Sequence, residues 1–96
     1  MQVEFRPAAR ADLDAIAVYT KREWGTGKAR AYIGQLRAAA MGLSDFPQRY
    51  PLYNSKIGPF RKAACGEHLI FYVITAEKIE IVRVLHNRVD VDPLMG

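Results

Sequence analysis

The sequence contains a single cysteine, Cys65, and no long apolar run. One cysteine allows no internal disulfide, which fits a reducing cytosol. No apolar stretch approaches the roughly 18 to 20 residues that a helix needs to span a bilayer. The N-terminal residues also have no apolar segment of the kind found in signal peptides. We therefore expect a soluble cytoplasmic protein that makes no membrane contact.

The chain also has no glycine-rich phosphate-binding loop and no Cys or His pair at metal-ligand spacing. No cofactor or metal is therefore expected. The net charge of +4 suggests an acidic partner but is too small to establish nucleic-acid binding. Residues 47–75 are the most basic part, and aromatic residues are interleaved with their charges. Such a mixture can bind nucleic acid by stacking, or it can be an ordinary solvated loop over packed aromatics.

Ninety-six residues, half of them hydrophobic, predict one domain spanning residues 1–96. Residues 2–6 alternate as a short strand does. Residues 8–24 and 26–46 repeat apolar positions at three- and four-residue steps, which predicts two helices. Gly25 separates them and Thr26 is placed to cap the second, so the pair reads as an αα-hairpin.

The second half of the chain predicts strands over residues 60–65, 68–75 and 78–85, joined by tight turns. The Pro, Gly and Asn content of residues 47–59 predicts a loop before them. Strands connected this way form an antiparallel meander. The whole chain is therefore predicted to be an α+β two-layer domain: an N-terminal strand, an αα-hairpin and a three-stranded antiparallel meander, with the helices on one sheet face.

Both faces of this sheet are predicted to be apolar, although two helices can cover only one. In the strand 68–75, alternation places Leu69, Phe71 and Val73 on one face and Ile70, Tyr72 and Ile74 on the other. In the strand 78–85 it places Ile79, Ile81, Arg83 and Leu85 on one face and Val82, Val84 and His86 on the other. The second face is then covered either by a partner protein or by residues 47–59 and the C-terminal tail.

Polar side chains that could carry chemistry gather where the last strands end. Histidine suits acid–base work near neutral pH, and arginine can hold a phosphate. Histidines at strand ends also serve as hydrogen-bonded structural groups. Arg83 lies within a strand, where a buried charge needs a partner such as Glu4, Asp12 or Asp90 unless it contacts a target directly. The candidates are Arg61, His68, Arg83, His86, Arg88 and Asp90.

Three segments together resemble the ParE toxins of the ParE/RelE type II toxin–antitoxin superfamily. They are "FRPAARADLDAIAVYTKREWG", "HLIFYVI" and "IEIVRVLHNRVD", and the resemblance spans nearly the whole chain. It implies a bacterial toxin with the RelE/ParE-like fold. It further implies that the toxin inhibits DNA gyrase without catalytic chemistry and is neutralised by a ParD-like antitoxin in a hetero-oligomer.

On this basis we predict two contact surfaces. The target-binding residues are Arg61, Arg83, His86, Arg88 and Asp90. The antitoxin-binding residues are Leu13, Ile16, Tyr19, Tyr72 and Ile74. We weigh this against two alternatives, a non-toxic interaction module of the same fold and a ribosome-dependent mRNA endoribonuclease of RelE type.

The ribonuclease alternative would use Arg61, His68, His86 and Arg88 as its catalytic residues. Two departures from the RelE pattern count against it. His68 stands where an arginine is typical of that group, and no tyrosine follows Arg88.

Overall fold

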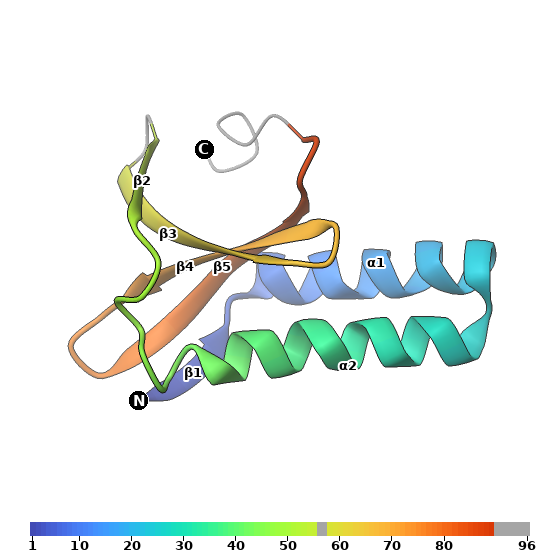
Figure 1. Cartoon of the computed structure of the whole chain (residues 1–96), viewed down its shortest axis with the longest axis horizontal. Coiled ribbons are helices and arrows are strands. Elements are labelled where there is room, and N and C mark those ends of the chain that lie inside the picture. Colours follow the sequence, from blue (N-terminus) through green and yellow to red (C-terminus); the bar gives the residue numbers. More distant parts are fainter. Residues whose placement is uncertain (56–57, 90–96) are drawn as a thin grey trace.

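The computed structural model describes residues 1–55 and 58–89, which form two helices on one side of a five-stranded sheet (Figure 1). This confirms the predicted α+β fold. The helices are α1 (Pro7–Trp24) and α2 (Thr26–Gly42). The strands are β1 (Gln2–Phe5), β2 (Leu52–Ser55), β3 (Gly58–Cys65), β4 (His68–Ile74) and β5 (Lys78–His86).

A single glycine joins the two helices. Gly25 adopts a positive φ of 93°, which an L side chain rarely tolerates. Its N–H donates to the Lys21 carbonyl at 2.9 Å, and its own carbonyl accepts from the Ala29 N–H at 3.1 Å. Gly25 therefore ends α1 and begins α2. The prediction that Thr26 caps α2 is wrong, because Thr26 is already the first helical residue and the start of α2 has no side-chain cap.

The sheet order is β1-β5-β4-β3-β2. The predicted antiparallel meander of β3, β4 and β5 is confirmed, and β1 pairs parallel to β5 with Gln2 opposite Lys78. Strand β2 was not predicted. It lies within the expected loop 47–59 and pairs with β3, with Leu52 opposite Arg61. Four residues between turn-forming neighbours are too short a pattern to distinguish from a loop.

The main core lies between the helices and the sheet. Leu13 of α1 and Leu36 of α2 are 2% and 1% exposed there. From the sheet, this core takes Ala63, Ile70, Tyr72, Ile79, Ile81 and Val84.

A β-bulge changes the faces of β5. Phe71 lies opposite Arg83, but Tyr72 lies opposite Ile81, so Val82 is an extra residue in β5. The extra residue reverses the alternation that follows it. Val84 consequently packs in the helix-facing core and Leu85 packs on the other face. The prediction that Leu85 shares a face with Ile79 and Ile81 is therefore wrong.

The sheet face away from the helices has its own apolar cluster. Phe60, Phe71, Val82 and Leu85 form it, and none of them is more than 8% exposed. Tyr53 of β2 packs edge-on against Phe71, with ring centroids 6.1 Å apart. The structure thus favours the alternative in which the segment 47–59, through Tyr53, helps to cover this face, instead of an open face awaiting a partner.

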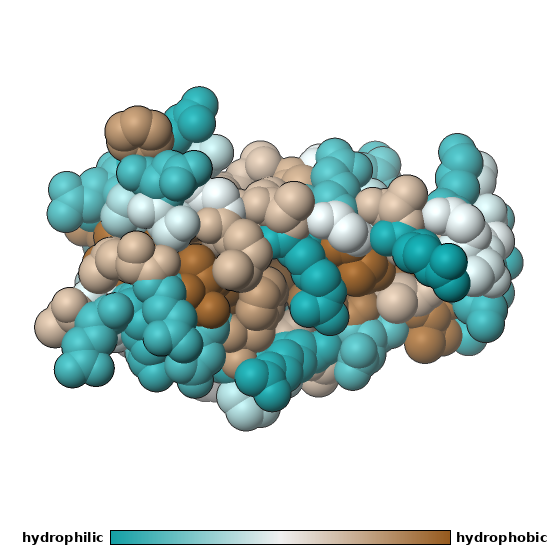
Figure 2. Space-filling model, turned by 90° about the horizontal axis from the view of Figure 1, so that it is seen from below, coloured by the Kyte–Doolittle hydropathy of each residue, from teal (hydrophilic) through white to brown (hydrophobic). Residues whose placement is uncertain are grey.

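On the surface of the described chain, apolar and charged residues alternate over short distances. Viewed from below, brown and pale areas form a band that teal charged side chains interrupt (Figure 2). Neither helix in the described residues is long and apolar enough to cross a membrane.

Candidate functional site

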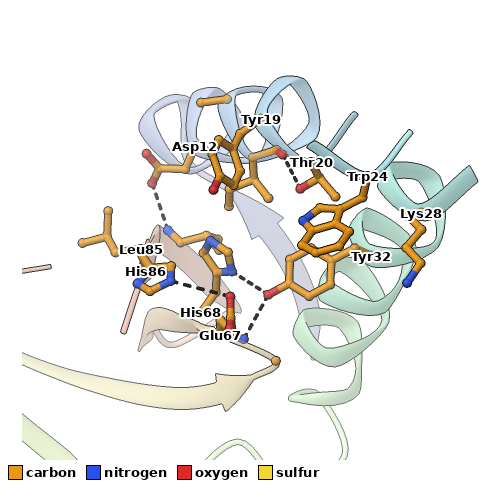
Figure 3. Close-up of a pocket in the computed structure, with 14 residues that line it drawn as sticks. Asp12, Tyr19, Thr20, Trp24, Lys28, Tyr32, Glu67, His68, Leu85 and His86 are labelled. Atoms are coloured by element: carbon orange, nitrogen blue, oxygen red, sulfur yellow. Dashed lines mark hydrogen bonds and ion pairs between the residues drawn. The ribbon is translucent and has the colours of Figure 1, made fainter. Parts of the chain in front are cut away.

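A hollow of about 700 Å³ opens between the helical hairpin and the turn that joins β3 to β4 (Figure 3). Its wall from α1 includes Ile16, Tyr19 and Trp24, and its wall from α2 includes Tyr32. Tyr19 is 60% exposed and Trp24 is 66% exposed. Large apolar side chains are usually buried, so two exposed aromatic rings beside one hollow mark it as a candidate contact surface.

The two histidines meet at the floor of this hollow. Antiparallel pairing of β4 with β5 places His68 opposite His86. Their rings stand edge to face with centroids 5.4 Å apart. Two of the predicted site residues are therefore brought together, from positions 18 residues apart in the sequence.

Tyr32 is hydrogen-bonded to His68 and to the turn beside it. Its hydroxyl oxygen accepts a hydrogen bond from the Glu67 N–H at 3.1 Å and lies 2.5 Å from His68 Nδ1. The hydroxyl and Nδ1 therefore share one hydrogen bond, in which the tautomer of His68 decides which atom donates. Burial, followed by the neighbouring His86, lowers the pKa of His68 below its usual value, although Glu67 acts in the opposite direction.

Gly66 allows Tyr32 to approach the turn. Its φ of 58° belongs to the left-handed region, and a Cβ added there would lie 2.7 Å from the Tyr32 ring. Burial raises the pKa of the Tyr32 hydroxyl, which therefore stays protonated. The ring of α2 thus rests directly on the backbone of the β3–β4 turn.

His86 connects this cluster to Arg88. Its Nδ1 accepts a hydrogen bond from the Arg88 N–H at 3.1 Å, and its Nε2 lies 3.8 Å from a Glu67 carboxylate oxygen. The Asn87 N–H also donates to the Glu67 carbonyl at 2.9 Å. The backbone that follows β5 is therefore held by the turn and by His86, and Arg88 itself is exposed.

Arg83 forms an ion pair with Asp12, one of the partners expected from the sequence. Its Nε and Nη2 donate to the two carboxylate oxygens at 2.7 and 2.8 Å. The Val84 N–H donates to the same carboxylate at 2.9 Å. The hydrogen bond to Asp12 raises the pKa of Arg83 further. This pairing joins α1 to β5 and engages the guanidinium that was predicted to contact a target.

Arg61 lies away from the histidines. Its guanidinium donates to the carbonyl oxygens of Tyr50 and Gln48, at 2.5 and 3.4 Å. In β3 it stands four residues before Cys65, the partner of His68, and four strand residues span about 13 Å. The prediction that Arg61 joins His68 and His86 in one site is therefore wrong. Asp90 lies outside the described residues.

The predicted antitoxin contacts divide into two groups. Leu13 and Tyr72 are 2% and 0% exposed, and the Tyr72 hydroxyl donates to the Pro47 carbonyl at 2.7 Å. They belong to the core, so their prediction as contact residues is corrected. Ile74 is partly buried against the same core. Ile16 and Tyr19, by contrast, line the hollow.

The sequence did not single out Tyr32 as a site residue. Its only signal was an apolar position on the inner face of the second helix, and helical spacing cannot show that a hydroxyl reaches a turn 35 residues away. Among residues 1–55 and 58–89, no three His, Cys, Asp or Glu side chains are grouped to hold a metal. The site as described combines an apolar wall with a hydrogen-bonded histidine floor, which suits protein contact.

Comparison with known proteins identifies the family. Residues 3–91 match the family described as the ParE toxin of the type II toxin–antitoxin system, parDE. The chain is 40% identical to Toxin ParE1 of Mycobacterium tuberculosis over 88 residues, covering 90% of this chain and 89% of that protein. It is 34% identical to Toxin ParE1 of Caulobacter vibrioides over 89 residues, covering 92% and 91%.

Solved structures agree on the fold. A chain of the chromosomal ParDE toxin–antitoxin system from P. aeruginosa superposes with a TM-score of 0.79 at 19% identity, covering 90% of this chain and 95% of that one. A chain of the toxin–antitoxin complex RelBE2 from Mycobacterium tuberculosis gives a TM-score of 0.65 at 25% identity, covering 90% of each chain. The resemblance seen in the sequence is thereby confirmed, and this chain belongs to the ParE toxin family of bacterial type II toxin–antitoxin systems.

Proposed function

We propose that this toxin acts in the cytoplasm by inhibiting DNA gyrase and that a ParD-like antitoxin neutralises it by covering the hollow. The observation that carries the proposal is the exposed aromatic surface beside the hollow in a chain of the ParE family. Tyr19 and Trp24 leave apolar area in water, and a partner that covers them gains about 25 cal/mol per Å² of apolar surface. Ile16 and Tyr19 are the antitoxin contacts we retain.

The target contact is proposed at the end of β5. His86 is half-buried and Arg88 is exposed, and both stand beside the hollow, at the end of the sheet where β3 turns into β4. We call His86 and Arg88 the rim of the hollow. Asp90 stays a prediction for this rim from the sequence alone. Arg83 and Arg61 are less suited to target contact, because their guanidinium groups already bond within the chain.

Gyrase inhibition is tested with purified toxin in a DNA supercoiling assay. We expect supercoiling to stop when toxin is added and to recover when a ParD-like antitoxin is added first. Translation in a cell extract should continue under the same conditions. Arg88→Ala should weaken the inhibition at least about tenfold if Arg88 is a contact hot spot, whereas Arg30→Ala removes the same charge from exposed α2 and should have little effect.

The second candidate is the RelE-type ribonuclease, which the close pair His68 and His86 favours. Two imidazoles can act as acid and base in phosphodiester cleavage. Against this, both Nδ1 atoms are engaged in hydrogen bonds within the chain and Arg61 stands apart. If mRNA on ribosomes is cut and supercoiling is unaffected, the ribonuclease replaces gyrase inhibition. If the chain neither inhibits supercoiling nor cuts mRNA, it is the non-toxic interaction module.

A further inference from the structure

We propose that Tyr32 and His68 form a latch that positions the His86–Arg88 rim for its target, and that acid opens the latch by protonating His68. The positioning part rests on the proposed function, since it assumes that this rim contacts gyrase. The latch itself is a property of the fold and is testable without the target. Tyr32 and His68 are positioning residues in this proposal, not contact residues.

The latch follows a continuous path of contacts from α2 to the rim. The Tyr32 hydroxyl bonds to both the Glu67 N–H and His68 Nδ1. The His68 ring then stands edge to face with His86. His86 in turn accepts the Arg88 N–H. One hydroxyl on α2 therefore supports two strands and the backbone of the residue proposed to meet the target.

The turn supplies a second connection to the same rim. The Glu67 N–H bonds to Tyr32, and the Glu67 carbonyl accepts the Asn87 N–H at 2.9 Å. The backbone N–H of Glu67 thus bonds to α2, and the backbone carbonyl of the same residue bonds to the segment that follows β5. Figure 3 shows Tyr32, His68, Glu67 and His86 converging at the floor of the hollow. Loss of the Tyr32 hydroxyl should loosen both connections together.

Protonation opposes this arrangement. An imidazolium has a proton on both nitrogens, so Nδ1 of a charged His68 can only donate, and it then competes with the Glu67 N–H for the Tyr32 oxygen. A charged His68 would also stand beside His86. Glu67 favours the charged form, but its side chain is 81% exposed and therefore screened. The ionisable side chains that line the hollow with His68 are Tyr32 and Lys28 on α2, Asp12 and Tyr19 on α1, Glu67 in the turn and His86 on β5, and Cys65 lies opposite His68 on β3.

Three variants test the latch in the full chain. Tyr32→Phe keeps the ring on Gly66 and removes only the hydroxyl. His68→Asn places an amide oxygen near the position of Nδ1, so it can accept the Tyr32 proton but cannot titrate. Tyr19→Phe is the control, because it removes a hydroxyl from an exposed tyrosine that lines the same hollow. The measurements are hydrogen-exchange protection of the Glu67 amide between pH 5 and 8, and gyrase inhibition.

We expect Tyr32→Phe to lower Glu67 protection about tenfold at pH 7.5, the effect of one lost hydrogen bond, and to weaken gyrase inhibition several-fold. Tyr19→Phe should leave Glu67 protection unchanged. In the wild type, protection should fall only below the usual histidine pKa of about 6.5, as the pH passes through the lowered pKa of His68. His68→Asn should keep the protection and remove this pH dependence.

Two results would overturn the latch: equal Glu67 protection in Tyr32→Phe and Tyr19→Phe, or an acid-dependent loss that persists in His68→Asn. Unchanged gyrase inhibition in Tyr32→Phe, despite lost protection, would overturn the positioning role. If the wild type does not inhibit gyrase, the proposed function and the positioning role are both wrong, and the Glu67 measurements still decide whether the latch exists.

Discussion

At the scale of single residues, one carboxylate organises the joint between the helices and the sheet. Asp12 accepts three hydrogen bonds, two from the Arg83 guanidinium and one from the Val84 N–H. All three donors lie directly after Val82, the extra residue of the β-bulge. A bulge leaves the strand ladder locally disrupted. The carboxylate therefore stabilises the irregular part of β5 from the neighbouring helix.

Replacing Asp12 by Asn should lower the free energy of unfolding by about 1 to 3 kcal/mol. The substitution removes the charge that pairs with Arg83, and partly buried charges are costly to leave without their partner. Urea unfolding followed by circular dichroism measures the difference. Asp14→Asn is the matched control, because it removes the same charge from an exposed position of α1. Equal destabilisation by both variants would show that the pairing is not the cause.

The lowered pKa of His68 predicts a pH-dependent stability. The unfolded chain binds a proton to this histidine at a higher pH than the folded chain does. The stability that neutral His68 contributes is therefore fully present above the pKa of histidine in the unfolded chain, about 6.5. It is lost as the pH falls through the lower pKa of His68 in the folded chain. Urea midpoints measured from pH 8 to pH 5 should decrease, and less steeply in His68→Asn. Equal slopes in the two proteins would contradict the assignment.

At the scale of elements, the β3–β4 turn and α2 depend on each other through Gly66. The left-handed φ and the close Tyr32 ring both require a residue without a side chain there. Three other described glycines, Gly27, Gly34 and Gly42, lie in α2 with nothing within 4 Å of an added Cβ. Glycine is therefore required by structure at the turn and merely tolerated in the helix.

We expect Gly66→Ala to destabilise the protein by about 1 to 3 kcal/mol, from backbone strain and displacement of Tyr32. Gly34→Ala should stabilise it by about 0.5 to 1 kcal/mol, because alanine is the better helix former. Thermal unfolding of the two variants gives opposite shifts of Tm if this is correct. A neutral Gly66→Ala would show that the Tyr32 ring can move without cost.

Periodicity predicted both helices and β3 to β5 because their burial repeats regularly along the chain. It could not reveal the bulge at Val82, since an extra residue in a strand is defined by the register with its neighbour. The contact between His68 and His86 follows from the same register. The sequence predicted only that both histidines lie near the ends of strands. Tyr32 was missed for a similar reason, because its role depends on how closely α2 packs against the β3–β4 turn. A sequence pattern does not contain that distance.

At the scale of the whole molecule, exposed aromatic side chains lie on α1, whereas the apolar cluster on the far sheet face is buried. The far-face cluster of Phe60, Phe71, Val82 and Leu85 is at most 8% exposed, whereas Tyr19 and Trp24 are 60% and 66% exposed. The exposed apolar surface therefore lies on a different side of the protein from the sheet face that the sequence predicted to await a partner. An antitoxin that covers the hollow would bury the only tryptophan of the chain.

Trp24 should report this binding directly. We expect its fluorescence emission to shift to shorter wavelength when a ParD-like antitoxin is added, because the indole leaves water. Any tryptophan of the antitoxin is replaced by phenylalanine for the measurement. Tyr19→Ala should weaken the binding, while Arg37→Ala, on the exposed side of α2, should not. A saturated complex with unchanged emission would place the antitoxin elsewhere.

The parallel pairing of β1 with β5 has a consequence for synthesis. It pairs Gln2, in the first strand of the chain, with Lys78, in the last strand. A ribosome adds roughly 5 to 20 residues per second, so β1 waits several seconds for its partner strand while the helices and the first hairpin strands are already available. A chain interrupted before β5 also lacks Arg83 and Val84, which donate hydrogen bonds to Asp12. Only a polypeptide that already includes β5 can close this sheet, so the harmful activity we propose would be withheld until residues 78–86 have been made.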